Sequence, residues 1–152
     1  MRAILPTAMI MLLVGCVSPP RVELAGNAEI DDRSDSAASA ILPIQINNPN
    51  DRSIELIEYV YSISIPGQPS WQGRHAGGLV LSPGFDRVAH LPIVLPASIP
   101  DGSEGWISGS LHYLDTSTLA ESLAEWGLRP TTSFSGRFAI TTPMGPIHEI
   151  SP

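Results

Sequence analysis

The chain has 152 residues, with 15 acidic and 8 basic side chains and a formal net charge of −7. A negatively charged protein without a basic cluster is repelled by phosphate, so nucleic acid is not expected as a partner. The 15 prolines and 13 glycines interrupt the chain too often for long helices. With Val, Ile and Thr frequent between them, they indicate an all-β protein.

The first 15 residues have the pattern of a secretion signal. Arg2 is followed by an apolar run from Ile4 to Val14, shorter than the roughly 20 residues that a membrane-spanning helix needs. The run ends Leu13-Val14-Gly15-Cys16. This ending resembles the lipobox of bacterial lipoproteins, in which the cysteine thiol receives diacylglycerol before cleavage. The resemblance implies that residues 1–15 are a lipoprotein signal peptide and that Cys16 carries the lipid.

Cys16 is the only cysteine, so no disulfide can form within the chain. The alternative for Cys16 is an ordinary apolar residue in an uncleaved segment. If the cysteine is lipidated, two or more acyl chains would hold the protein stably on a membrane. Val17 is not aspartate, the residue that retains enterobacterial lipoproteins at the inner membrane. By that resemblance, the expected location is the bacterial cell envelope, with the periplasmic face of the outer membrane favoured over the inner membrane.

Residues 16–21 are expected to form a short tether, which keeps the following domain close to the membrane. One β domain is expected over residues 22–142, followed by a proline-broken tail at 143–152. Val22 and Leu24 alternate with polar residues, as in an edge strand. Asp31 to Ser36 is expected to be a polar loop, and its spacing lacks the glycine and distal glutamate of a calcium-binding loop.

The stretch from Ile44 to Ile65 predicts a β-hairpin. Apolar residues recur at every second position on both arms, the period of a half-buried strand; they are Ile44, Ile46, Ile57, Tyr59, Tyr61, Ile63 and Ile65. Between the arms, Asn48, Pro49 and Asn50 supply a fixed φ and short side chains that bond nearby backbone, as a tight reversal requires.

Further strands and one helix are expected after this hairpin. Within Trp71–Leu81 a strand is expected to begin near Arg74, and its Gly77 and Gly78 suggest a bulge or a close approach of neighbouring backbone. The next strand is expected at Val88–Leu95, and its prolines place it at an edge or end. The last two strands are expected at Trp106–Leu114 and Phe134–Ile140. Between these two, a short helix should span residues 118–127 and cap the sandwich.

Four features in this order resemble the water-stress and hypersensitive-response (WHy) domain of the folded, second group of late embryogenesis abundant (LEA) proteins. They are Gln45-Ile46-Asn47-Asn48-Pro49-Asn50, Tyr59-Val60-Tyr61, Leu81-Ser82-Pro83-Gly84 and Leu91-Pro92-Ile93-Val94-Leu95. The resemblance covers residues 22–141. It implies an immunoglobulin-like or fibronectin type III-like β-sandwich associated with stress tolerance, and it brings no catalytic residues to this chain.

No constellation for catalysis, metal binding or a cofactor stands out. None of the four histidines has metal-ligand spacing with another histidine or a cysteine, so no metal is expected. The paired glycines lack the lysine and helix of a phosphate loop, and the serines lack the setting of a nucleophile elbow. Trp71, in an expected loop, is a candidate contact residue for a partner or the membrane interface. Its alternative is packing beneath its own loop.

Two functional hypotheses follow. In the first, the chain is a non-enzymatic, membrane-anchored lipoprotein whose WHy-type domain protects protein clients or the envelope during desiccation, osmotic or temperature stress. In the second, it is an immunoglobulin-like envelope adaptor that binds one protein partner, by strand addition at a sheet edge or through Trp71. In both, the membrane partner is reached through the lipid on Cys16, and no cofactor is involved.

Overall fold

The computed structural model describes residues 18–116, 125, 127 and 129–142. The strands are β1 (Arg21–Leu24), β2 (Ala28–Arg33), β3 (Ala37–Asn47), β4 (Ile54–Ser64), β5 (Trp71–Leu81), β6 (Asp86–Pro96), β7 (Glu104–Asp115) and β8 (Thr131–Thr141). The short helix expected over residues 118–127 lies outside the described residues, apart from Glu125 and Gly127.

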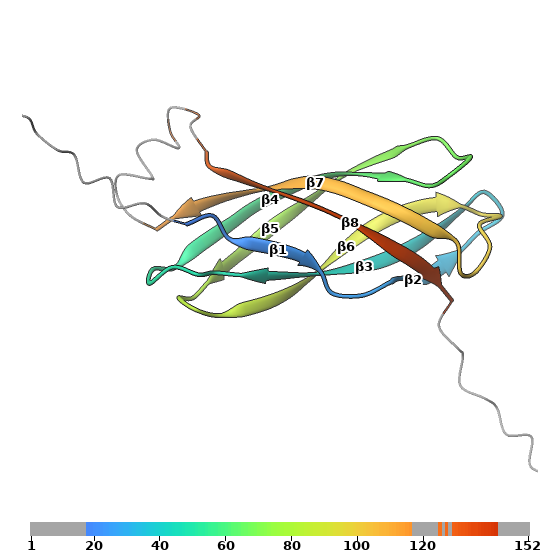
Figure 1. Cartoon of the computed structure of the whole chain (residues 1–152). Helices are drawn as coiled ribbons and strands as arrows, with labels where there is room; N and C mark the ends of the chain where they lie inside the picture. The colour runs from blue at the N-terminus through green and yellow to red at the C-terminus, as the bar shows by residue number, and fades with distance from the viewer. Residues whose placement is uncertain (1–17, 117–124, 126, 128, 143–152) are drawn as a thin grey trace, which may run out of the picture.

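The strands form two layers (Figure 1). In the first, β3 pairs with β6 along one edge, and with β1 and then β2 along the other. In the second, the order is β8-β7-β4-β5. These pairings are all antiparallel, and the layers are joined by a short parallel pairing of β2 with β8, at Ala28–Ile140 and Glu29–Thr141. The expected all-β sandwich is confirmed.

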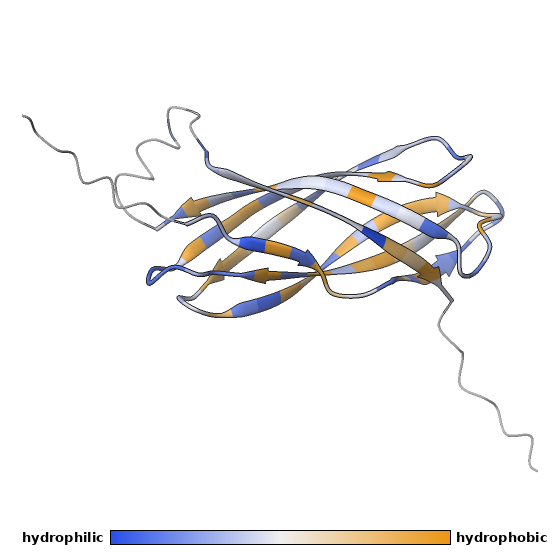
Figure 2. Cartoon of the chain, viewed as in Figure 1, coloured by the Kyte–Doolittle hydropathy of each residue, from blue (hydrophilic) through white to orange (hydrophobic). Residues whose placement is uncertain are grey.

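The core lies between the layers and follows the period-2 alternation of the strands. Figure 2 shows apolar and polar residues alternating along the strands. As expected, one face of β6 is buried at Leu91, Ile93 and Leu95, while Val94 faces out. The last two strands bury Ile107, Leu111, Tyr113, Phe134, Phe138 and Ile140.

The stretch from Ile44 to Ile65 is not a hairpin, which corrects the sequence-based prediction. The strands β3 and β4 on either side of Asn48 belong to different layers and share no pairing. The turn therefore carries the chain from one layer to the other. An arch of this kind and a hairpin have the same alternation and the same turn residues, because each arm needs one core face in both cases.

Gly77 and Gly78 form a bulge in β5, as predicted from the paired glycines, because they lie between Ala76 and Leu79 opposite Ile57 alone. Against β7 the register shifts at the same place, and there Ile57 is the extra residue between Leu56 and Glu58. The shift explains why Leu56 is buried and Ile57 only half-buried, although the alternation placed Ile57 in the core. A Cβ on Gly77 would lie 2.1 Å from the Leu56 carbonyl oxygen, so only glycine fits there.

Strand boundaries differ most in the first third of the chain. Asp31, expected in a loop, belongs to β2, and only residues 34–36 turn the chain into β3. β3 begins at Ala37, seven residues before the first arm of the expected hairpin. The small residues of this half of β3 carry a weak apolar signal, yet Ala38 and Ala40 are buried.

The sandwich has two ends, each formed by a set of loops. Residues 18–20, 48–53 and 82–85 lie at one end, which we call the Asn48 end. Residues 34–36, 65–70 and 97–103 lie at the other, which we call the Asp35 end. Among the described residues, no helix has the length and hydropathy that a membrane crossing requires.

Candidate functional site

Asn48 is a fully buried polar side chain at the layer-crossing turn. Its Nδ2 donates to the carbonyl oxygens of Arg52 at 2.7 Å, Leu81 at 3.1 Å and Ser82 at 3.2 Å. Its Oδ1 accepts from the backbone N of Asn50 at 3.2 Å and from Asn50 Nδ2 at 2.9 Å. Burying an amide is tolerated because both ends of the group are hydrogen-bonded.

The backbone of Asn48 is bonded to the same neighbouring loop. Its N–H donates to the Phe85 carbonyl at 3.1 Å, and its own carbonyl accepts from the Gly84 N–H at 3.0 Å. The chain crosses from one layer to the other at residues 48–53 and again at residues 82–85. The hydrogen bonds of Asn48 therefore hold these two loops together. The Asn48 and Pro-Gly features that carry the family resemblance lie side by side here, and Asn48 has a structural part in holding them.

Asn50 holds the segment that leads into the first strand. Its Oδ1 accepts from the Ser18 N–H at 2.8 Å, and its Nδ2 donates to the Ser18 carbonyl at 2.9 Å. The amide therefore bonds both backbone groups of one residue that lies 32 positions earlier in the chain. Pro49, between the two asparagines, lies with Ser18 against a shallow depression. Ser18 is consequently fixed at the Asn48 end.

Exposed apolar side chains occur at both ends of the sandwich. Phe85 is 65% exposed and Val80 is 55% exposed at the Asn48 end. Trp106, 42% exposed, and Val94, 44% exposed, lie toward the Asp35 end. Phe85 was not identified in the sequence analysis. The available signal was its position directly after a Pro-Gly turn and outside the alternating pattern that marks core residues.

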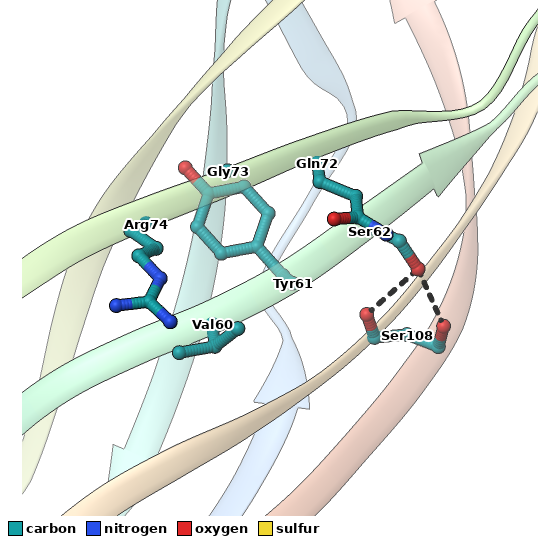
Figure 3. Close-up of a pocket in the computed structure, with 7 residues that line it drawn as sticks. All are labelled: Val60, Tyr61, Ser62, Gln72, Gly73, Arg74 and Ser108. Atoms are coloured by element: carbon teal, nitrogen blue, oxygen red, sulfur yellow. Dashed lines mark hydrogen bonds between the residues drawn. The ribbon is translucent and has the colours of Figure 1, made fainter.

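A polar hollow of about 460 Å³ lies on the outer face of the second layer (Figure 3). Ser62 Oγ lies 3.0 Å from Ser108 Oγ and donates to the Ser108 carbonyl at 3.4 Å. Arg74 lines the hollow and approaches Glu58 at 3.8 Å, an exposed pair of little energetic value. The lining contains no histidine, cysteine or carboxylate that could activate a serine.

The remaining sequence-predicted site residues are placed as follows. Cys16 lies outside the described residues. Trp71 is the first residue of β5 rather than part of a loop, is half-buried, and packs against the core. Its ring centroid lies 5.8 Å from that of Tyr61. A contact role for Trp71 stays a prediction. Within the part of the chain that the structure describes, no group of three His, Cys, Asp or Glu side chains is arranged to hold a metal ion.

Tyr61 connects the two layers near the open edge of the sandwich. From β4 it crosses to β6, where its hydroxyl donates to the Pro92 carbonyl at 2.5 Å. Strand β6 pairs with β3 alone, so it is an edge strand, as its prolines predicted. Pro92 has no N–H, and Tyr61 occupies its carbonyl, which makes this point of the edge a poor template for another strand.

Stability is expected to fall as the pH rises from about 10 to about 12. Burial raises the pKa of Tyr61 and of Tyr59 from 10.0 to about 12. In this window the unfolded chain releases protons that the folded chain keeps, so the contribution is complete below pH 10 and is lost through pH 12. Urea unfolding at pH 9 and pH 11 measures the loss, and Tyr61→Phe should make it smaller. An equal loss in Tyr61→Phe would contradict this assignment.

No protein-family model matches the chain, and no curated protein sequence matches it either. Several solved structures are similar in fold. A Northeast Structural Genomics Consortium target, solved by X-ray crystallography, has a TM-score of 0.56 and 14% identity, covering 88% of this chain and 92% of that chain. A protein described as ApaA from Bordetella pertussis has a TM-score of 0.56 and 16% identity, covering 82% and 97%.

The third similar structure is of a protein described as late embryogenesis abundant. Its TM-score is 0.53 at 10% identity, and the match covers 82% of this chain and 73% of that chain. At such identities the similarity shows the fold alone. This chain therefore has a β-sandwich that resembles the fold of a LEA protein, in line with the fold that the ordered sequence features implied.

Proposed function

We propose that this chain is a lipid-anchored, non-enzymatic protein of the bacterial cell envelope, whose WHy-type domain protects membranes or protein clients during drying, salt or temperature stress. The observation that carries the proposal is the fold, which resembles that of a LEA protein over 82% of the chain. The lipobox ending in Cys16 supports the anchor. Protection by this chain is the work of a folded body, because its strands bury a continuous core.

The site geometry also favours contact over turnover. The buried Asn48 amide has its hydrogen-bonding groups occupied by backbone and by Asn50, so it offers nothing to a substrate. In the hollow of Figure 3, Ser62 and Ser108 bond each other. A nucleophile needs a neighbouring base that takes its proton, and the residues that line this hollow provide none.

The mature chain is expected to reduce aggregation of a test enzyme during drying or heating at a roughly stoichiometric ratio, without nucleotide. Light scattering and recovered enzyme activity measure the effect, with albumin at equal mass as the control. In cells, a deletion strain should survive drying less well than its parent, and survival should return with the native gene but not with Cys16→Ser. If the chain protects the enzyme no better than albumin does, and the deletion strain survives drying as well as its parent, the proposed stress function is contradicted.

The second candidate is an envelope adaptor, favoured by the long strand β5 at the open edge of the sandwich. Strand β5 pairs with β4 alone, so its second side could receive a strand from a partner, whereas the free side of β6 is interrupted at Pro92. Affinity capture from membranes under ordinary growth separates the two functions. One stoichiometric partner favours the adaptor, whereas varied, stress-dependent clients favour protection.

A further inference from the structure

We propose that the Asn48 end of the sandwich rests on the bilayer, with the Phe85 side chain inserted at the boundary between headgroups and acyl chains. This inference rests on the proposed function, because it requires the lipid on Cys16. It goes beyond that function by assigning the orientation of the domain and a second, non-covalent membrane contact. Three properties of the Asn48 end support it: its distance from the lipid, its exposed apolar surface and its charge.

The reach of the tether is set by the bonds between Asn50 and Ser18. Both backbone groups of Ser18 are bonded to the Asn50 side chain, so Ser18 is held at the Asn48 end. Cys16 is two residues away, and two extended residues span at most about 7 Å. A lipid on Cys16 therefore enters the bilayer within about 7 Å of this end. The Asp35 end lies at the opposite ends of the 11-residue strands, so it cannot be the end of the domain that is nearest to the lipid.

Phe85 lies at the same end, held by the same network. Its carbonyl accepts from the Asn48 N–H, and its own N–H donates to the Ser82 carbonyl at 3.2 Å, so the loop backbone is fixed while the ring stays 65% exposed. The loop Ser82-Pro83-Gly84-Phe85 carries no charged side chain that would have to be desolvated. An exposed aromatic on a fixed, uncharged loop is suited to the membrane interface.

Charge favours the same orientation, because anionic lipid headgroups repel carboxylates and attract arginine. The Asp35 end is acidic, with two arginines, Arg33 and Arg137, among the carboxylates of Glu29, Asp31, Asp32, Asp35, Asp101 and Glu104. The Asn48 end carries less net negative charge, with Arg21, Arg52, Arg87 and Arg129 beside Glu23, Asp51, Glu55, Asp86, Asp115 and Glu125. Among the described residues, the Asn48 end therefore approaches an anionic surface at the lower electrostatic cost.

The test uses the full lipoprotein, purified from cells and reconstituted in vesicles of phosphatidylethanolamine and phosphatidylglycerol with brominated acyl chains, which quench tryptophan on contact. Phe85→Trp is compared with Val94→Trp, a matched exposed position toward the Asp35 end, and the native tryptophans give the baseline. The expected result is that the emission added by Phe85→Trp is quenched several times more than that added by Val94→Trp.

Mass spectrometry of the same preparations shows whether Cys16 carries diacylglycerol. It therefore distinguishes a failure of this inference from a failure of the proposed function. A chain without diacylglycerol on Cys16 overturns both. A lipidated chain in which the two variants are quenched equally, or not at all, overturns only the membrane contact of Phe85. A photo-crosslinker at position 85 that labels a protein rather than lipid also overturns it, and it assigns the loop to a protein partner.

Discussion

Replacing Asn48 with aspartate is expected to lower the free energy of unfolding by about 3 kcal/mol. The two side chains have the same shape, so no cavity forms. The substitution exchanges the Nδ2 donor for an oxygen that faces the carbonyl oxygens of Arg52, Leu81 and Ser82. Three acceptors lose their donor at a fully buried position, and a buried charge is added. Urea unfolding followed by tryptophan fluorescence measures the change.

The matched control is Asn27→Asp. Asn27 is exposed, and its Oδ1 accepts from the Ala139 N–H at 3.2 Å, a bond that aspartate keeps. Its free energy of unfolding should change by less than about 0.5 kcal/mol. Equal small effects in the two variants would show that the buried amide contributes little to the fold, and Asn48 would then have to be reconsidered as a binding residue.

Gly77→Ala is expected to cost about 3 kcal/mol, because the new methyl group would overlap the backbone of the bulge. The Cβ would lie 2.1 Å from the Leu56 carbonyl oxygen and 2.4 Å from its carbonyl carbon. Backbone atoms in a paired strand cannot move aside as the end of a flexible side chain can. The midpoint of urea unfolding should fall while its slope stays the same.

The adjacent glycine provides the control for this substitution. Gly78 has φ 55°, and a Cβ there would meet nothing within 4 Å. Gly78→Ala should therefore cost only the strain of the left-handed conformation, about 1 kcal/mol. If both variants lose the same free energy, backbone strain rather than the close approach to Leu56 accounts for most of the loss.

The strands could be predicted where large apolar residues alternate with polar ones. Along β6 the spacing of Leu91, Ile93 and Leu95 identified both the strand and its core face. In the first half of β3 the inward positions are Ala38 and Ala40, whose small side chains give little contrast with their neighbours, so the strand was missed there. Periodicity shows which face is buried, but only when the buried residues are large.

The pairing of strands could not be predicted from the same pattern. Ile46 and Ile54 lie on either side of the turn, in β3 and β4. Each is expected to face the core whether β3 and β4 pair with each other or belong to separate layers. The choice is made by contacts distant in sequence. Asn48 bonds Leu81 and Ser82, 33 and 34 positions away, and so places the turn beside another crossing. No local window contains that information.

The candidate site was predictable in its residues but not in its arrangement. Asn48 and Asn50 were recognised as turn residues, which is the role that short amide side chains commonly have. Their separate partners depend on the fold. Asn48 reaches the loop before β6, whereas Asn50 reaches Ser18, in a segment that the sequence shows only as a spacer. The exposure of Phe85 likewise follows from where its loop is held.

The parallel pairing of β2 with β8 has a consequence for how the chain is made. Ala28 finds its partner, Ile140, only when the last strand is present, so a nascent chain has its first strands finished long before their neighbour emerges. Closing a sandwich between strands about a hundred residues apart is entropically slow. Until β8 has been synthesised, the edge of β2 that pairs with it is left without its partner, and an unpaired strand edge in a nascent chain favours aggregation.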